Sequence, residues 1–474
     1  MNKLRVILTT PPYSSQERLG KLGFLGGALP SISLLYLASS LRDRCELSVM
    51  DTSFTNLDED AALDSVRRFA PDIVGISAVT PSISRAQSFA SRIKSIDSRI
   101  VTILGGPHIT SVPMETMERT PAIDIGVVGE GEITLQDIVE LYDGSLNSLI
   151  GIKGTIVRDS FGKLHRADSR ELIADIDSLG FPAYGLVDHS VSLHPALFKT
   201  RRVPAIHAIT SRGCAHTCSY CNTNIFNKKL RFHSADYVMG LIKHLMSLGY
   251  REISFEDDNF TDHRTRLTEI CNRLIDERID IVWSVNARID TVDENMLRLM
   301  RRAGCWYISY GVESGSQDTL DRIGKKITLN LIRQRIELTR KCGMEAKGFF
   351  IIGFPWETKQ SIKETVDFAL SLPLSDVNIF PLTPFPGTAV FEQTKICGDF
   401  ANDWSKMDLQ QIVYVPPGLT GEYLQNEIKR LLLCFYFRPR TILNYFVRIV
   451  VARDILISAA KALMPSWFSK IRSV

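Results

Sequence analysis

The chain has 474 residues, of which 45% are apolar and 23% are charged, so its composition excludes disordered, collagen-like and coiled-coil proteins. At about 150 residues per domain, this length predicts two or three domains. The net charge of +3 is too small to indicate nucleic-acid binding. No apolar run has the length of a spanning helix, and the N-terminus is typical of a first strand rather than a signal peptide. Nine cysteines, an odd number, are typical of a reducing compartment, so we expect a cytoplasmic protein.

Short runs rich in Val and Ile alternate with amphipathic segments over the first 140 residues. The predicted strands are 4–9, 46–51, 72–77, 100–104 and 125–128. The predicted helices are 30–43, 58–69, 82–96, 112–118 and 132–141. The alternation predicts a parallel sheet with helices on both faces and a ligand site beyond the carboxyl ends of its strands. No GxGxxG motif or P-loop is present, so a dinucleotide or nucleoside triphosphate is not the first expectation.

A second alternation begins near residue 203, after a connector at 143–202 whose segments 151–158 and 163–166 predict a hairpin. The predicted strands are 205–210, 252–256, 282–286, 307–312, 346–352 and 376–380. The predicted helices are 234–248, 264–277, 293–303, 328–342 and 358–370. Six β/α units predict a partial parallel barrel with its chemistry at the carboxyl ends of the strands.

Three cysteines, Cys214, Cys218 and Cys221, follow the first predicted barrel strand within eight residues. Thiolates bind iron–sulfur clusters, zinc or Cu(I), so one alternative is a zinc site completed by His216 or His233. A set of three cysteines instead leaves one iron of a [4Fe–4S] cluster open for a non-protein ligand, as redox chemistry on a bound substrate requires. Most of the other six are expected to be buried: Cys45, Cys271, Cys305, Cys342, Cys397 and Cys434.

The spacing CxxxCxxC, with Tyr220 before the last cysteine, resembles the signature of the radical S-adenosylmethionine (radical SAM) superfamily. The resemblance continues at successive strand ends, in 255–261 (FEDDNFT), 311–316 (GVESGS), 352–358 (IGFPWET) and 381–388 (PLTPFPGT). With the N-terminal Rossmann-like domain and its GGPH sequence at 105–108, about 440 residues resemble the cobalamin-binding radical SAM subfamily. That subfamily includes class B methyltransferases, hopanoid-modifying enzymes and the anaerobic magnesium-protoporphyrin cyclase.

The resemblance implies three cofactors: a [4Fe–4S] cluster, S-adenosylmethionine (SAM) and cobalamin. Cys214, Cys218 and Cys221 would ligate three irons and SAM the fourth. The residues implied around SAM are Tyr220, Glu256, Asp258, Ser284, Arg288, Glu313, Ser314 and Gly353. Those implied around cobalamin are Ser77, Gly105, Gly106 and Glu130. The alternatives are strand-end capping for Asp257, Asp258 and Glu313, and a surface ion pair for Arg288.

One departure from the wider cobalamin pattern concerns the cobalt ligand. The chain lacks Asp-x-His-x-x-Gly, the motif that supplies a histidine to cobalt in cobalamin mutases. His108 is expected to pack near the nucleotide tail rather than to bind cobalt.

The fold class implied is α/β: a Rossmann-like cobalamin-binding sheet (1–142), the connector (143–202), a partial (βα)6 radical SAM barrel (203–395) and a helical, basic C-terminal cap (396–474). The activity implied is reductive cleavage of SAM to a 5′-deoxyadenosyl radical, for methylation of an unactivated carbon or phosphorus centre. One alternative is a cobalamin-dependent oxidative cyclase or ring-rearranging enzyme without methyl transfer. Another is a non-catalytic cobalamin- or zinc-binding sensor. A methylthiotransferase is disfavoured because the N-terminal domain carries only Cys45.

The charge is unevenly distributed along the chain. Residues 429–474 carry +8, which leaves −5 on the rest. These basic, aromatic segments predict helices that cap the barrel, or alternatively a surface that meets an anionic membrane or admits a lipophilic substrate. The expected partners are a small-molecule or lipid-like substrate and a reductant such as flavodoxin or ferredoxin, with no nucleic acid.

Overall fold

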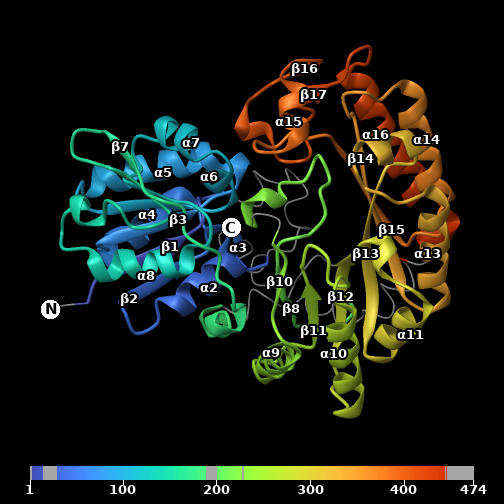
Figure 1. The fold of residues 1–474 in the computed structure, drawn as a ribbon, viewed down its shortest axis with the longest axis horizontal. Helices are drawn as coiled ribbons and strands as arrows, with labels where there is room; N and C mark the ends of the chain where they lie inside the picture. Colours follow the sequence, from blue (N-terminus) through green and yellow to red (C-terminus); the bar gives the residue numbers. More distant parts are fainter. Residues whose placement is uncertain (1–2, 14–28, 188–199, 227–228, 444, 446–474) are drawn as a thin grey trace, which may run out of the picture.

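The structure, a computed structural model, describes residues 3–13, 29–187, 200–226, 229–443 and 445. It contains two α/β units that lie side by side, each built on its own sheet (Figure 1). The α/β class predicted from the sequence is confirmed.

The N-terminal sheet has the order β2-β1-β3-β4-β5-β6-β7, and its first five strands are parallel. These strands are β1 (Arg5–Thr9), β2 (Glu46–Met50), β3 (Ile73–Ser77), β4 (Val101–Gly105) and β5 (Ile125–Val127). The predicted hairpin is present as β6 (Thr155–Arg158) and β7 (Leu164–Arg166). Because β6 pairs antiparallel with β5, the hairpin extends this sheet instead of forming a separate connector.

Both faces of the N-terminal sheet are buried under helices, as its continuous apolar strands require. Along β1, Ile7 points into the core under α4 and α5, whereas Val6 and Leu8 point into the core under α2 and α8. The helices are α2 (Ile32–Ser40), α4 (Glu59–Phe69), α5 (Ile83–Ile96) and α8 (Gly131–Leu141), with the short α3 (Thr52–Thr55), α6 (Pro107–Ser111) and α7 (Pro113–Arg119).

The barrel sheet is fully parallel and follows the chain in the order β8, β11, β12, β13, β14 and β15. Its strands are β8 (Ala205–Ala208), β11 (Glu252–Phe255), β12 (Val282–Ala287), β13 (Cys305–Glu313), β14 (Glu345–Ile352) and β15 (Asp376–Pro381). Its helices are α9 (Ala235–Ser247), α10 (Arg264–Asp276), α11 (Glu294–Arg302), α12 (Gln317–Arg322), α13 (Leu329–Lys341) and α14 (Lys359–Ser371). Side-chain caps begin five of them: four are oxygens of Ser234, Asp293, Thr328 and Thr358, and one is the ring nitrogen of His263.

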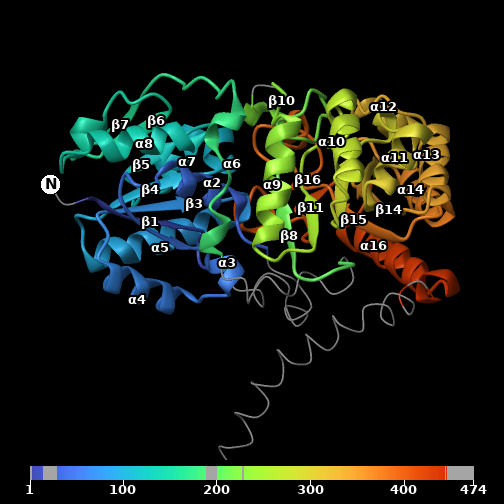
Figure 2. The same cartoon turned by 90° about the horizontal axis from the view of Figure 1, so that it is seen from below.

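The C-terminal region is helical in part. The helix α15 (Ala389–Thr394) comes just before it, and α16 (Gly421–Tyr436) within it packs on α14 and β15 at the end of the molecule away from the N-terminal sheet (Figure 2). Between them lies a small antiparallel pair, β16 (Asp399–Phe400) and β17 (Tyr414–Val415), which the sequence did not predict. The predicted tail segments beyond residue 445 lie outside the described residues. In the part of the chain that is described, no helix is long and apolar enough to cross a membrane.

A buried charge cluster joins the two units. Arg212, in the short strand β9 (Ser211–Arg212), donates to Glu130 (2.7 Å) and Glu132 (2.5 Å) of the N-terminal unit. Arg231, in β10 (Arg231–Phe232), donates to the second carboxylate oxygen of Glu130 (2.8 Å) and to the Ile173 carbonyl (2.6 Å). The four charged side chains are only 4–12% exposed. Burial alone would raise the pKa of Glu130, but the two guanidinium groups outweigh it and lower that pKa.

We predict that Glu132→Ala destabilises the protein by on the order of 3 kcal/mol, the low end for a broken buried ion pair, because Arg212 keeps its bond to Glu130. Urea denaturation measures the change. The matched control is Glu140→Ala on the same helix, whose pairing with Arg44 is half-exposed and contributes about 0–1 kcal/mol. Equal destabilisation by both substitutions would contradict the prediction.

Candidate functional site

The cysteine loop lies between β9 and β10, which pair antiparallel at the carboxyl end of β8. Gly213 adopts a φ of +87°, and a Cβ there would collide with the Lys229 carbonyl, so this turn requires glycine. The loop is held at two further points: the Ser219 amide donates to the Ile323 carbonyl, and the Ser219 carbonyl accepts from the Val390 amide, each at 3.0 Å. The three thiols are therefore presented by an anchored loop.

The three thiols are unpaired and at least partly accessible. Burial and nearby negative groups raise the pKa of the Cys214 thiol, and raise that of Cys221 to about 12. A cationic metal centre reverses this effect and favours the thiolates, so the donor set fits a thiolate-bound iron–sulfur cluster. The Arg288 guanidinium lies 3.9 Å from the Cys218 sulfur.

The remaining cysteines follow the expected burial only in part. Cys45, Cys271 and Cys305 are buried as predicted. Cys342 and Cys397 are half-buried, and Cys434 is exposed, which corrects the expectation that most would be buried. Cys342 caps the end of α13, Cys397 follows the end of α15, and Cys434 lies in the last turn of α16 outside its buried face, so none of the three is held in the interior of an element.

Two predicted SAM-binding carboxylates, Glu256 and Asp258, line a cavity at the carboxyl end of β11. Glu256 accepts hydrogen bonds from Ser254 (2.6 Å) and Asn286 (3.1 Å). Burial raises the pKa of Asp258. Ser284 donates to Ser254 (3.1 Å), so its hydroxyl supports the strand that carries Glu256.

Arg288 and Asp257 form contacts within the protein, in partial agreement with the alternatives of an ion pair for Arg288 and a strand-end cap for Asp257. Arg288 pairs with Asp290 at 2.9 Å, as in the ion-pair alternative, but its side chain is only 7% exposed, and it also donates to the Lys325 carbonyl at 2.8 Å. Asp257 is fully buried and accepts from the amide of Thr210 (3.0 Å) and from the hydroxyl of Ser211. Burial raises the pKa of Asp257 to about 6. Asp257 thus fastens the end of β8 to the end of β11.

Glu313 sits at a β-bulge with a left-handed φ of +70° and forms a buried ion pair with Lys325 at 2.7 Å. The same ammonium lies 3.4 Å from the Tyr220 hydroxyl, and the Tyr220 ring meets Phe354 edge-on at 6.1 Å. Burial raises the pKa of Tyr220 well above its usual value. The sequence reasoning missed Lys325, since no motif distinguishes it from the adjacent Lys326.

Two predicted SAM-binding positions have other roles in the described structure. Ser314 is fully buried, and its hydroxyl is bonded to Thr365 of α14 (2.9 Å) and to the Ser316 amide (3.1 Å). Gly353 takes a φ of +97°, and its amide donates to Glu357 (2.7 Å). Direct contact of either residue with SAM stays a prediction.

The cavity has a volume of about 340 Å³ and lies between the two units, against the carboxyl ends of both sheets. All four predicted cobalamin residues line it, and the N-terminal unit contributes Ser77, Gly105, Gly106, Gly129, Glu130 and Gly131 together with apolar side chains. A Cβ on Gly105 would meet no heavy atom within 4 Å, so the backbone there is open to a bulky planar ligand. These observations fit a corrin.

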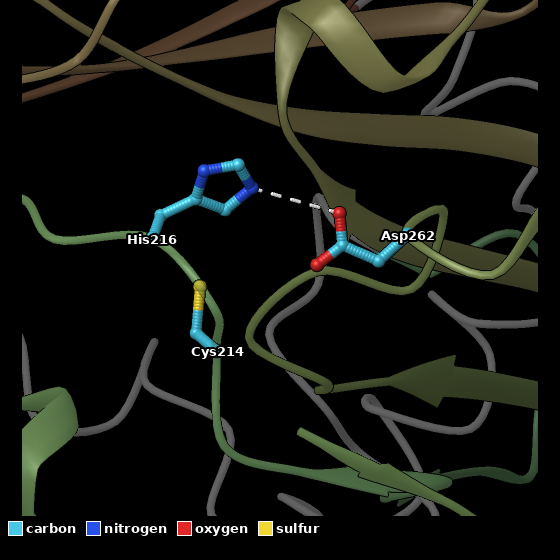
Figure 3. Close-up of side chains that lie close together, drawn as sticks. All are labelled: Cys214, His216 and Asp262. Carbon is cyan, nitrogen blue, oxygen red and sulfur yellow. Dashed lines mark ion pairs between the residues drawn. The ribbon is translucent and has the colours of Figure 1, made fainter. Parts of the chain in front are cut away.

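The histidines occupy distinct positions. His108 is buried, with Nδ1 at 3.0 Å from the Thr80 hydroxyl and its ring edge-on to Trp404, and burial lowers its pKa to about 4. The Nδ1 of His233 pairs with Asp177 and its Nε2 with Tyr36, so it is not available to complete a zinc site. Of the two zinc-site candidates, His216 is the one that lies beside Cys214 (Figure 3).

Two family models match the chain: the radical SAM superfamily over residues 208–369 and the B12 binding domain over residues 22–139. An uncharacterised methyltransferase of Pyrococcus horikoshii is 31% identical over 448 residues, covering 94% of this chain and 95% of that protein. The anaerobic magnesium-protoporphyrin IX monomethyl ester cyclase of Rubrivivax gelatinosus is 26% identical over 480 residues, covering 98% and 83%. The solved radical SAM methyltransferase TsrM of Kitasatospora setae superposes with a TM-score of 0.69 at 17% identity, over 92% of this chain and 90% of that one. It supports the fold.

We predict that alanine at Cys214, Cys218 or Cys221 removes bound iron and abolishes SAM cleavage, because each thiolate is expected to hold one iron of the cluster. Iron, sulfide and 5′-deoxyadenosine are measured after anaerobic purification. The control, Cys434→Ala, removes an exposed thiol away from the loop and keeps its iron. Retained turnover with an intact cluster in Cys218→Ala would refute the ligand assignment, and failure of the unmodified, zinc-free protein to take up iron and sulfide would refute the cluster.

We also predict that Gly105→Val weakens cobalamin binding by about tenfold or more, equivalent to about 1.4 kcal/mol, because the added methyl groups project into the cavity. The change in visible absorbance on adding hydroxocobalamin reports the affinity. Gly185→Val is the matched control, since Gly185 is also open to a Cβ but does not line the cavity. Equal affinities for the two variants would show that the corrin lies elsewhere.

Proposed function

Because the chain belongs to the radical SAM enzymes that carry a B12-binding domain, with a [4Fe–4S] cluster, SAM and cobalamin as cofactors, we propose that it transfers a methyl group to an unactivated carbon or phosphorus centre. The observation that carries the proposal is the shared cavity. Ser77, Gly105 and Gly106 approach it from the cobalamin side, and Glu256 and Asp258 approach it from the SAM side. A methyl relay requires this adjacency, whereas a sensor that binds cobalamin alone does not.

When bound, the reduced cluster supplies the electron that cleaves SAM, and cobalamin supplies a carrier for the methyl group. The chain's own residues provide the geometry. Glu256 and Asp258 offer carboxylates to the amino and hydroxyl groups of SAM at the carboxyl end of β11. Lys325, which is paired with Glu313, places a positive charge beside the Tyr220 hydroxyl.

Water is excluded mainly by apolar side chains from both units. The cavity wall includes Leu8, Ile32, Leu34, Ile76, Ile103, Val127, Leu135, Ile209, Ile225 and Phe226. A dry wall protects radical chemistry from side reactions and strengthens electrostatic interactions within the cavity. The reductant we propose is a flavodoxin or ferredoxin, and the substrate is a small or lipid-like molecule.

A second candidate is oxidative cyclisation without methyl transfer. The similarity to the magnesium-protoporphyrin cyclase of Rubrivivax gelatinosus over 98% of this chain supports it. The two reactions differ in their products from SAM: methyl transfer yields S-adenosylhomocysteine as well as 5′-deoxyadenosine, whereas cyclisation yields 5′-deoxyadenosine alone.

We predict that the full-length enzyme, reconstituted with cluster and cobalamin and reduced, forms both S-adenosylhomocysteine and 5′-deoxyadenosine from SAM labelled in its adenosyl group. Chromatography with mass detection measures the two products. Gly105→Val, with its cobalamin site narrowed, is expected to lose S-adenosylhomocysteine and to keep 5′-deoxyadenosine. Formation of 5′-deoxyadenosine alone by the unmodified enzyme, in the presence of its substrate, would favour the cyclase.

A further inference from the structure

Cys214, His216 and Asp262 form a compact donor set, of which the radical chemistry requires only Cys214. Cys214 and His216 lie on the cysteine loop, and Asp262 lies on the segment between β11 and α10 (Figure 3). One thiol, one imidazole nitrogen and one carboxylate oxygen all lie within 4.8 Å of one another. The three residues are half-buried, so the donor set is open to a metal ion from solution.

We propose that the enzyme without its [4Fe–4S] cluster binds Zn²⁺ through Cys214, His216 and Asp262. This zinc then competes with assembly of the [4Fe–4S] cluster. Sulfur, nitrogen and oxygen donors with one open position match the ligand set of three-ligand zinc sites. Zinc bonds of about 2.0–2.2 Å at tetrahedral angles separate a nitrogen and an oxygen ligand by about 3.3–3.5 Å. The His216 Nε2 and the Asp262 Oδ1 are 3.6 Å apart. The pair therefore needs only a small adjustment to share an ion.

The Asp262 carboxylate supplies an independent indication of a cation-binding site. Its Oδ1 accepts a hydrogen bond from the Asn259 side chain. Its Oδ2 is buried and has no hydrogen-bond partner among the described residues. An unsatisfied buried carboxylate oxygen costs free energy, and a bound cation removes that cost. Asn259 in turn accepts from the Thr261 hydroxyl and the Arg288 amide, so the carboxylate is oriented by a second shell typical of metal sites.

Sharing of Cys214 makes the two metal states mutually exclusive. A zinc ion that holds Cys214 removes one of the three thiolates available to the cluster. Zinc also binds a given set of donors more tightly than Fe²⁺ does. The cluster-free enzyme would then be held in an inactive zinc form whenever zinc is present before iron and sulfide. This inference concerns metal loading and does not depend on whether the enzyme transfers a methyl group.

Two reciprocal variants test the proposal on the full-length, cluster-free chain titrated anaerobically with Zn²⁺. His216→Ala is expected to weaken zinc binding by about tenfold or more, since it removes one of three ligands, and to accept a full [4Fe–4S] cluster. Cys221→Ala is expected to keep the zinc affinity of the unmodified chain and to lose the cluster. Cobalamin binding by each variant verifies that it is folded. Loss of zinc binding in Cys221→Ala together with retention in His216→Ala would overturn the proposal, because zinc would then be held by the three thiolates.

X-ray absorption at the zinc edge supplies a direct ligand count. The expected spectrum has one sulfur at about 2.3 Å and the remaining ligands, nitrogen and oxygen, at about 2.0–2.2 Å. Three sulfur ligands, or no stoichiometric zinc at all, would refute the site. In a competition experiment, zinc added before iron and sulfide should block cluster formation in the unmodified chain but not in His216→Ala. Equal inhibition of both proteins would show that zinc acts elsewhere.

Discussion

The buried charge cluster of Arg212, Arg231, Glu130 and Glu132 determines how the two cofactor-binding units meet. Ion pairs removed from water are retained only where each charge has close, well-aligned partners, and here both oxygens of Glu130 receive a guanidinium donor. Such pairing tolerates little displacement. Arg212 precedes Cys214 by two residues, and Glu130 and Glu132 flank Gly131 on the cavity wall. The ion pairs thus fix the cysteine loop relative to the loops of the N-terminal unit that line the cavity.

With the two units held in this way, the topology of the two sheets determines what faces the cavity. Parallel strands gather their carboxyl ends at one edge, and each sheet directs that edge into the same cavity. Asp257 ties the end of β8 to the end of β11, so the barrel edge facing the cavity is itself internally bonded. The N-terminal edge is instead lined by glycines such as Gly105 and Gly106. One side is therefore rich in polar side chains and the other exposes backbone, as expected for a small polar cosubstrate facing a large planar cofactor.

Local periodicity is sufficient to predict the longer strands and helices, because apolar alternation and turn residues act over short stretches of chain, but not the short helices α3, α6 and α12. It could not assign the hairpin of β6 and β7 to the N-terminal sheet, because the residue pattern of β6 does not indicate which strand it pairs with. It also missed the pair β16 and β17, each only two residues long. Among site residues, Lys325 and the arginines of the charge cluster were missed because their roles arise from contacts distant in sequence. The motif that implies Ser314 beside SAM also could not indicate that its hydroxyl is bonded to Thr365 across the sheet–helix contact.

The barrel side of the cavity is electrostatically incomplete without cationic ligands. Glu256 and Asp258 line it, Asp258 acts electrostatically on the thiols of Cys214 and Cys221, and Asp262 lies within 4.8 Å of Cys214. Arg288 is already paired with Asp290, and Lys325 with Glu313. Burial raises the pKa of Asp258 with no compensating charge, so its ionised form is unfavourable until a cation approaches. An iron–sulfur centre and the cationic groups of SAM supply that charge. The same deficit makes the loop receptive to zinc, so metal selection depends on which cation reaches Cys214 first.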